Sequence, residues 1–421
     1  MDYNAGPAHL RHAAMTHHIV FVAPFFLNTT LRFLKGTLAL PDTAVSLISQ
    51  DPAEKLPGEL RAGLAGHWRI DNGLDAGQIA GAVKQLSSRL GAVHRLFGPL
   101  EQLQVPLAQV REALDIPGIN VNAAENFRDK SRMKTVLRAA DVACAHHCLA
   151  HSAGEARAFA ENQGYPLVVK PPAGAGGKGT WRLDNNDQLN AFLANHNPSV
   201  EQPCLFEEFV TGEEHSFDSV VINGELVWHS ISRYSPSPLQ VMENAWIQWC
   251  VLLPRSIDGA NYDPIRATAA KGLSALGLET GLTHMEWFQR EDGSVAISEV
   301  GARPPGAQIT TLLSYAHDRD FYHAWPRLMA FEEFEPPQRS YACGAAYLRA
   351  QGGRRIRQVH GIDEVRRRFG PIIVEMHLPV AGQSRSDSYE GDGYCIVRHP
   401  DTEVVENALN TIIQLVHVDA H

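Results

Sequence analysis

Cysteine is scarce in this sequence, with six residues among 421. So few thiols over this length do not make a disulfide framework, and we expect the reducing environment of the cytoplasm. Cys144 and Cys148 enclose two histidines, but a structural zinc site needs four ligands, usually as two spaced pairs. No second pair follows, so ordinary packing is the favoured interpretation of these cysteines.

Long apolar runs and an excess of basic residues are also missing. No stretch approaches the roughly 18 consecutive apolar residues of a membrane span, so we expect no membrane contact. The formal net charge of −10 gives little bulk attraction to nucleic acid or to anionic lipid. With 44% hydrophobic and 20% charged residues, the composition is that of a folded protein. Neither nucleic acid nor a membrane is therefore expected as a partner.

The length of the chain and the changes in its sequence pattern predict several domains. We expect a flexible leader (residues 1–15), an N-terminal α/β domain (16–125) and a central subdomain (126–205). A C-terminal α+β domain (206–421) follows, and its last part, from about residue 340 to 421, forms a terminal lobe. In the N-terminal domain, apolar residues at helical spacing predict a helix over residues 78–96. Its first strand is not followed by a glycine-rich phosphate turn, so we place no nucleotide site there.

A glycine-rich segment, PPAGAGGKGT, lies between expected strands at residues 165–170 and 180–183. Its G-x-G-x-x-G spacing is a weak signal by itself. A dinucleotide-binding turn would open a helix at once, and a P-loop would place Lys before Ser or Thr; this segment does neither. Protein kinases use a glycine-rich flap, but the sequence has no H-R-D or D-F-G motif. The segment is either a flap over phosphates or a mobile surface hairpin.

Basic residues stand before this segment in two places. Lys130, Lys134 and Arg138 recur every four residues on an expected helix over residues 129–140, so like charges lie along one ridge. Residue type alone favours a solvated ridge, with a nearby anion as the alternative. Lys170 ends an apolar strand, and burial of its stem would place the ammonium where an anion binds.

The segment 281–306 predicts a hairpin that brings two carboxylates together. Asp292-Gly293 is a strong signal for a two-residue turn. Such a turn sets Glu286 directly opposite Glu299, with Cβ atoms roughly 5 Å apart. Like charges repel at this distance unless a cation joins them. The pairing therefore predicts a metal ion.

The same face of the hairpin carries two further polar residues. Alternation places His284 and Arg303 beside the two carboxylates, and Pro304 is expected to end the strand after Arg303. Carboxylate oxygens suit a magnesium ion that carries polyphosphate, and a fixed arginine suits an anion next to it. His284 is either a substrate-orienting or proton-accepting group, or a packed neighbour of the metal site.

Four segments in this order, RDKSRMK, PLVVKPPAGAGGKGT, LFEEFVTGEEHSFDSV and THMEWF…AISEVGARPPG, resemble the ATP-grasp superfamily. The resemblance covers residues 126–308 and implies an ATP-grasp fold of α/β and α+β class, with ATP between two α+β subdomains beneath the flap. It implies Glu286 and Glu299 as ligands of Mg²⁺, or of Mn²⁺, and Arg303 and His284 as catalytic residues. By motif position it also implies nucleotide-binding residues: phosphate and flap residues Lys134, Lys170, Gly174, Gly176, Gly177, Lys178 and Gly179, adenine-pocket residues Glu207, Glu208, Phe209 and Val210, and the ribose-binding Glu214.

The chain departs from the superfamily at one position. Many ATP-grasp enzymes read E-x-N-x-R where this chain has Gly301, so a further metal ligand is missing and the number of metal ions stays open. The form EVGARPPG, together with THME, is most similar to L-amino acid ligases. This implies an ATP-dependent C–N ligase that joins amino acids through an acyl phosphate and releases ADP and phosphate. The alternatives are another ATP-grasp ligase or carboxylase acting on a metabolic acid, or a silent nucleotide sensor. A homodimer is a further expectation.

Overall fold

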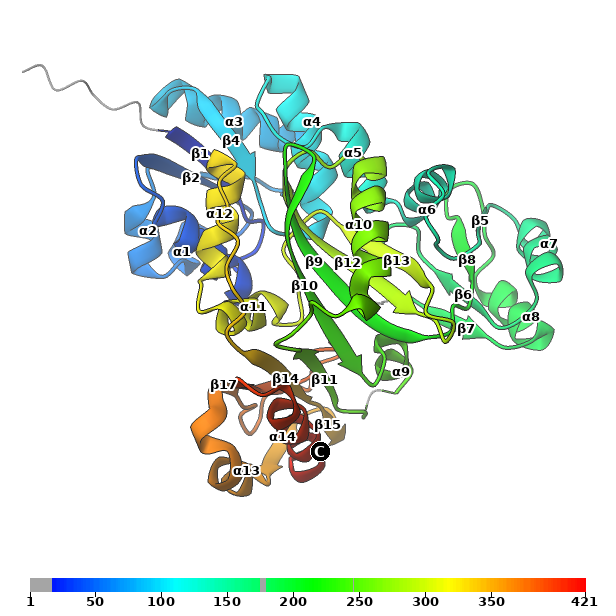
Figure 1. The fold of residues 1–421 in the computed structure, drawn as a ribbon. Coiled ribbons are helices and arrows are strands. Elements are labelled where there is room, and N and C mark those ends of the chain that lie inside the picture. Colours follow the sequence, from blue (N-terminus) through cyan, green and yellow to red (C-terminus); the bar gives the residue numbers. More distant parts are fainter. Residues whose placement is uncertain (1–16, 175–178, 245) are drawn as a thin grey trace, which may run out of the picture.

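The computed structural model describes residues 17–174, 179–244 and 246–421 (Figure 1). The expected leader at residues 1–15 and the flap residues 175–178 lie outside the described residues. Within the described ranges the chain forms sheets of four, eight, three and four strands. No helix in these ranges combines the length and the apolarity needed to cross a membrane.

The N-terminal part is a parallel sheet with the strand order β3-β2-β1-β4 and helices on both faces. The strands are His17–Val22 (β1), Thr43–Ser49 (β2), Gly66–Arg69 (β3) and Val93–Phe97 (β4). The helices are Asn28–Leu38 (α1), Gly58–Gly63 (α2), Ala76–Leu90 (α3) and Gln104–Leu114 (α4). β1 is apolar and buried on both faces, as a central parallel strand must be.

The helix expected over residues 78–96 is wrong at its C-terminal end. α3 ends at Leu90, because Gly91 adopts a φ of 93° that a helix cannot contain. Residues 93–97 form the edge strand β4 instead. The apolar residues continue past Gly91, so their spacing alone did not show that the helix ends at this glycine.

The central part is an antiparallel sheet with the order β5-β8-β6-β7. The strands are His147–Ala150 (β5), Leu167–Lys170 (β6), Trp181–Leu183 (β7) and Cys204–Glu208 (β8). The helices around it are Val121–Arg128 (α5), Lys130–Ala139 (α6), Ala153–Gln163 (α7) and Asn186–Asn195 (α8). β6 and β7 flank the glycine-rich segment, as expected, although each begins later than predicted.

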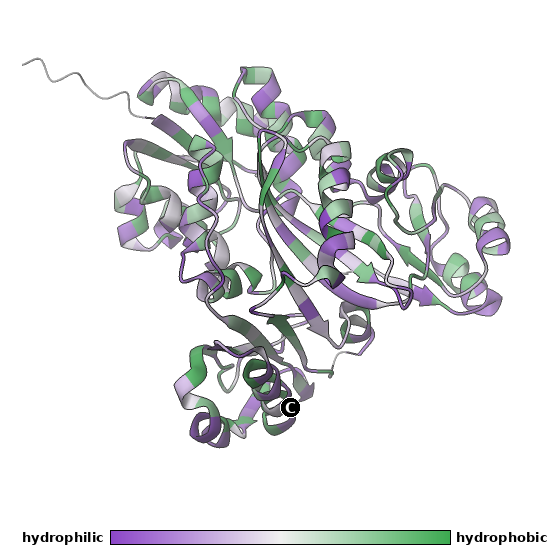
Figure 2. Cartoon of the chain, in the orientation of Figure 1, coloured by the Kyte–Doolittle hydropathy of each residue, from purple (hydrophilic) through white to green (hydrophobic). Residues whose placement is uncertain are grey.

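The largest sheet has eight antiparallel strands in the order β13-β12-β9-β10-β11-β14-β18-β17. Its strands are Glu213–Ile222 (β9), Glu225–Ser235 (β10), Trp249–Leu253 (β11), Gly281–Gln289 (β12), Val295–Gly301 (β13), Ala342–Leu348 (β14), Ile373–His377 (β17) and Gly393–His399 (β18). Hydrophilic residues enter the middle of this sheet (Figure 2), and those of β9 include the fully buried Ser216 and Asp218. Buried polar groups of this kind need hydrogen-bond partners. Asp218 has one in His284, a residue of the functional site described below.

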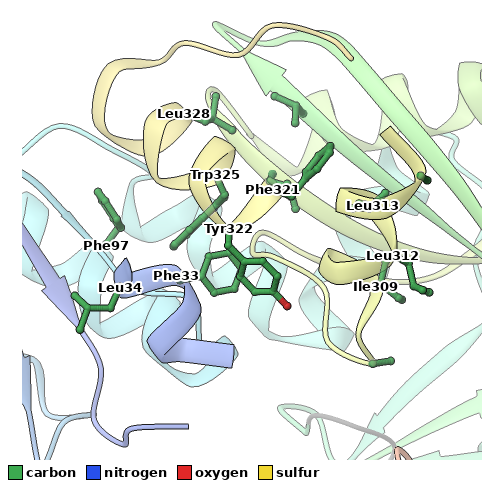
Figure 3. Packing of buried hydrophobic residues seen from close by; sticks show 14 of the residues in the cluster. Phe33, Leu34, Phe97, Ile309, Leu312, Leu313, Phe321, Tyr322, Trp325 and Leu328 are labelled. Carbon is green, nitrogen blue, oxygen red and sulfur yellow. The ribbon is translucent and has the colours of Figure 1, made fainter. Parts of the chain in front are cut away.

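Helices cover both faces of the large sheet. They are Pro238–Glu243 (α9), Asp263–Leu276 (α10), Ile309–His317 (α11) and Phe321–Phe331 (α12). α12 also packs against the N-terminal sheet, since Trp325 contacts Phe33 of α1 and Phe97 of β4 with ring centroids 5.0 and 5.4 Å apart (Figure 3). One hydrophobic core thus joins the N-terminal part to the large sheet.

The terminal lobe extends the large sheet and adds a small sheet of its own. The small sheet has the order β15-β19-β16, from Ala350–Gly352 (β15), Ile356–His360 (β16) and His417–Ala420 (β19). Ile362–Phe369 (α13) and Thr402–Leu415 (α14) pack against it and against β14 and β18. The loop before β18 reaches back to β11, where Trp249 Nε1 donates to the carbonyl of Tyr389 at 2.7 Å.

The β12–β13 hairpin confirms the predicted pairing of Glu286 with Glu299. The predicted two-residue turn is wrong: the Arg290 N–H donates to the Ser294 carbonyl at 2.9 Å, so residues 291–293 form a three-residue loop. This loop shifts the neighbouring pairs by one residue, and a β-bulge at Ser298 cancels the shift before Glu299. β13 also ends at Gly301, two residues earlier than expected.

Candidate active site

A cavity of about 440 Å³ lies where all parts of the chain meet. The central sheet, the large sheet, the N-terminal part and the terminal lobe each contribute to its wall. The predicted site residues in the wall are Lys170, Gly174, Glu207, Glu208, Phe209, Val210, Glu214, His284, Glu286, Glu299 and Arg303. Gly179 is the neighbour of the lining residue Thr180, and Gly176, Gly177 and Lys178 lie outside the described residues.

Glu207 is a buried carboxylate between two ammonium groups. Lys170 Nζ lies 2.8 Å from Glu207 Oε2, and Lys134 Nζ lies 3.3 Å from Oε1 without hydrogen-bond geometry. Burial alone would raise the pKa of Glu207, but the two lysines outweigh it and lower that pKa. Burial likewise opposes the charge on Lys170, yet Glu207 and Glu299 raise its pKa. Lys170 therefore presents a charged ammonium to the cavity.

Lys134 lies deeper than Lys170 and outside the cavity wall. It is fully buried, and its Nζ donates to the carbonyl of Ser298 at 2.7 Å, the residue that forms the bulge. Burial lowers the pKa of Lys134, opposed by Glu207. The interpretation of Lys130 and Lys134 as a solvated ridge is therefore wrong, because both are buried and the anions beside them are glutamates of the chain itself.

Lys130 is a site residue that the sequence reasoning missed. Its Nζ donates to Glu299 Oε1 at 2.7 Å and to the carbonyl of Gly174 at 3.1 Å, so it joins the start of the flap to β13. Burial opposes the charge on Glu299, but Lys130 and then Lys170 lower its pKa. Its position one helical turn before Lys134 is the sequence signal that could have identified Lys130 as a site residue.

The two opposed carboxylates of the hairpin fit a hard divalent cation. Glu286 and Glu299 both face the cavity beside Lys170. In the described part of the chain, no group of three or more His, Cys, Asp or Glu side chains is close enough to hold a metal by itself. Mg²⁺ commonly takes one or two carboxylates and completes its shell with phosphate oxygens and water. The donor set therefore fits a metal that arrives with a polyphosphate.

His284 is held by a second residue that the sequence reasoning missed. Its Nδ1 lies 2.7 Å from Asp218 Oδ1, and its Nε2 lies 3.7 Å from Glu286 Oε1. Asp218 is fully buried and accepts a second hydrogen bond from Ser216 Oγ at 3.0 Å. Burial would lower the pKa of His284, but Asp218 outweighs it and raises that pKa to about 9. His284 is therefore an imidazolium at neutral pH in this arrangement.

Arg303 is fixed by a carboxylate from the N-terminal part. Its Nε donates to Glu101 Oε2 at 2.5 Å, and its Nη1 donates to the carbonyl of Pro304 at 2.8 Å. Burial disfavours the guanidinium charge, but Glu101 raises the pKa of Arg303 above its ordinary value. Glu101 and Arg303 are 202 positions apart, and no sequence pattern linked them.

Part of the cavity wall suits a flat apolar ring bound to a polar group. Val168, Phe209, Val210 and Phe288 line it, and the Arg182 guanidinium lies 4.4 Å from the Phe209 ring centroid. Burial, followed by the Glu286 carboxylate, raises the pKa of Glu214 to about 8. The wall therefore offers hydrophobic contacts together with the buried acidic group of Glu214.

Comparisons with known proteins show what the sequence is similar to. Residues 135–316 match the family model of the ATP-grasp domain. The uncharacterized protein y4rH of Sinorhizobium fredii is 26% identical over 338 residues, covering 78% of this chain and 68% of that protein. The carbamoyl phosphate synthase large chain of Pasteurella multocida is 27% identical, over 53% of this chain and 20% of the synthase. An L-arginine-specific L-amino acid ligase of Bacillus subtilis is 24% identical, over 48% of this chain and 50% of the ligase.

The fold is similar to that of several solved structures. The crystal structure of an L-amino acid ligase from Bacillus licheniformis matches with a TM-score of 0.78 and 19% identity, covering 96% of this chain and 99% of the ligase. A phosphoribosylglycinamide synthetase from Anaerococcus prevotii matches with a TM-score of 0.69 and 16% identity, over 96% and 99% of the two chains. These likenesses concern the fold. The chain spans only about a fifth of the synthase and half of the arginine-specific ligase named above.

Proposed function

Because this chain has an ATP-grasp domain and the ATP-grasp fold, we propose that it is an ATP-dependent ligase that joins a carboxylate to an amine. The observation that carries the proposal is the convergence of Lys170, Glu286, Glu299 and Arg303 on one cavity. Carboxylate and triphosphate are both anionic, so they approach each other only where cations offset their repulsion. This cavity provides an ammonium, a guanidinium and a pair of metal-binding carboxylates.

The nucleotide would lie along the central sheet. Lys170 and Lys130 are suited to phosphate oxygens, and the flap from Gly174 to Gly179 would cover them. The segment from Glu207 to Val210 would bind adenine between apolar side chains, with Glu214 accepting from the ribose hydroxyls. Glu286 and Glu299 would hold Mg²⁺, or Mn²⁺, which when bound neutralises charge on the phosphate oxygens.

The acid would bind at Arg303. A carboxylate oxygen attacks the terminal phosphorus of ATP, the bond to the bridging oxygen breaks, and ADP leaves. The amine nitrogen then attacks the acyl carbon, the carbon–oxygen bond to phosphate breaks, and the amine loses a proton. The planar fork of Arg303 suits first the carboxylate and then the oxyanion of the tetrahedral intermediate. Asp218 holds His284 by a hydrogen bond and raises its pKa, which favours an orienting role over that of a base.

Amino acids are the proposed acid and amine, with a dipeptide or a similar amide as product. The similarity to L-amino acid ligases in fold and in part of the sequence supports this choice. The direct test is a screen of amino acid pairs for phosphate release from ATP, with mass spectrometry of the products. A pair-dependent release of ADP and phosphate with a new amide is expected. A screen without turnover for any pair would contradict the proposal and favour a silent nucleotide sensor.

Arg303→Ala provides the matched test of the site. Loss of the guanidinium should abolish amine-dependent ADP formation, on the order of 10²-fold or more, while nucleotide affinity stays nearly unchanged. Both quantities are measurable on the same preparation, by coupled assay and by calorimetric titration with ADP and magnesium. Full turnover in this variant would remove Arg303 from the mechanism.

A second candidate is an ATP-grasp ligase or carboxylase that uses bicarbonate or a metabolic acid. The similarity to carbamoyl phosphate synthase and to phosphoribosylglycinamide synthetase supports it. ADP release that requires bicarbonate, and that no amino acid pair stimulates, would favour this candidate. Release that depends on an amino acid pair in bicarbonate-free buffer would exclude it.

A further inference from the structure

Gly301 leaves a space in the cavity wall, and a carboxylate from another part of the chain fills it. A methyl group added at Gly301 would lie 3.1 Å from Glu101 Oε2, which is tighter than an ordinary contact. The same methyl group would lie 3.8 Å from Arg303 Nε. Position 301 is where the E-x-N-x-R pattern carries an asparagine. In this chain the side chain at that point in space therefore comes from Glu101.

The turn that carries Glu101 is anchored within the N-terminal part. Glu101–Leu103 form a short 3₁₀ turn (η2) directly after β4 of the N-terminal sheet. Leu103 is fully buried, and Gln104 Nε2 donates to the carbonyls of Gly98 and Leu100 at 3.0 and 2.9 Å. The carboxylate itself is largely buried within the cavity wall. The backbone position of Glu101 is therefore set within the N-terminal part.

Glu101 determines which edge of the Arg303 guanidinium is available. Nε donates to Glu101 and Nη1 donates to the Pro304 carbonyl, while Nη2 has no hydrogen-bond partner among the described residues. A guanidinium is planar, so fixing two of its nitrogens fixes the direction of the third. Arg303 lines the cavity and keeps part of its side chain exposed there.

We infer that Glu101 is a positioning residue, whose carboxylate in the space left by Gly301 aims the free edge of Arg303 at the acid substrate. The role of Glu101 in acid activation rests on the proposed function. The presence of its carboxylate in the space beside Gly301 does not depend on that function. Glu101 and Gly301 form a matched pair: a side chain at position 301 would make the carboxylate of Glu101 move from its place beside Arg303. The N-terminal part thereby supplies a necessary element of a site otherwise built by the ATP-grasp parts.

A second ion pair in this chain provides a control for a purely structural role of the Glu101–Arg303 pair. Arg95 Nη2 lies 3.1 Å from Glu332 Oε1 and also joins the N-terminal part to the region of α12. Neither residue lines the cavity. Glu332→Gln therefore removes an ion pair between the same parts without touching the site.

The kinetic test compares Glu101→Ala, Glu101→Gln, Gly301→Asn and the double variant Glu101→Ala/Gly301→Asn in the ligase assay. Glu101→Ala should lower kcat/KM for the acid by about tenfold or more and leave KM for ATP within about twofold, because only Arg303 loses its orientation. Glu101→Gln, which keeps an acceptor oxygen, should recover part of the loss. Glu332→Gln should resemble the unmodified protein. Unaltered acid kinetics in Glu101→Ala would overturn the inference.

The double variant tests the shared space. Gly301→Asn alone should be strongly impaired because its side chain meets the Glu101 carboxylate. In the Glu101→Ala background the same substitution should add little further loss, since the space is then open. Losses that multiply in the double variant would show that the two positions act independently and would contradict the pairing.

An activity-free measurement separates this inference from the proposed function. In NMR spectra of arginine-labelled protein, with Arg303→Lys used for assignment, the Nε–Hε signal of Arg303 should be protected from solvent exchange. It should lose that protection in Glu101→Ala and keep it in Glu332→Gln. If no acid–amine pair supports turnover but this pattern holds, the proposed function fails and the positioning of Arg303 stands. An unprotected signal in the unmodified protein would overturn the positioning itself.

Discussion

Glu207 shows how single residues set the charge of this site. The carboxylate is buried with Lys134 and Lys170 on either side, so one negative charge compensates two positive ones. Lys170, whose charge Glu207 and Glu299 stabilise, faces the cavity and is the group that a phosphate would meet. The neighbouring Glu208 is more exposed and accepts from Gln163 Nε2 at 3.2 Å.

Glu207→Gln should destabilise the protein by about 3–5 kcal/mol, because it leaves two buried ammonium groups without their counter-charge. Urea unfolding followed by circular dichroism measures this difference. Glu208→Gln is the matched control, one position along the same strand, and should change the free energy of unfolding by less than about 1 kcal/mol. Equal effects of the two substitutions would show that the buried cluster contributes no special stability.

The His284–Asp218 pair predicts a pH dependence of stability. The pKa of His284 is about 9 in the folded protein and near 6.5 when unfolded, so the folded state binds the proton more tightly. The resulting stabilisation is complete below pH 6.5 and is lost as the pH rises through 9. Its size is on the order of 3 kcal/mol. Asp218→Asn should remove it, so urea unfolding between pH 6 and 9.5 should be flatter in this variant. Identical slopes would contradict the ion pair.

At the scale of elements, the β12–β13 hairpin shows what a sequence pattern can and cannot predict. Alternation and the turn signal predicted the pairing of Glu286 with Glu299, and that pairing is confirmed. The turn itself was predicted wrongly, and the pairing survives only because a bulge at Ser298 compensates for the longer loop. A bulge depends on partners across the fold, here the Lys134 ammonium on the freed carbonyl, and a local pattern does not contain them.

Deletion of Ser298 should therefore destabilise the protein without moving Glu299. The pairs Trp287–Ile297 and Glu286–Glu299 become consecutive, so Glu299 stays opposite Glu286, while the carbonyl that accepts from Lys134 is lost. The free energy of unfolding in urea should fall by about 1–3 kcal/mol, because a buried ammonium loses a hydrogen-bond partner. Deletion of Glu291 shortens the loop to two residues, leaves every strand pair in place and should have a smaller effect. Equal effects of the two deletions would show that the bulge carbonyl contributes nothing to holding Lys134.

At the scale of the whole molecule, the site exists only where distant parts meet. The sequence resemblance predicted the ATP-grasp fold, and the structure and the comparisons confirm it. It could not predict Glu101 or Asp218 as partners of Arg303 and His284, because these contacts depend on how the N-terminal sheet and β9 are placed. The shared core around Trp325 fixes the first of these placements (Figure 3).

The order of the chemistry is the central claim, and one isotope measurement tests it most directly. The assay uses an acid substrate with both carboxylate oxygens replaced by ¹⁸O, together with ATP, magnesium and the amine found by the screen. Attack of the carboxylate on the terminal phosphorus, followed by expulsion of phosphate, transfers one ¹⁸O atom to each released phosphate. Mass spectrometry should find singly labelled phosphate in proportion to the amide formed. Unlabelled phosphate, or AMP and pyrophosphate in place of ADP and phosphate, would contradict the account.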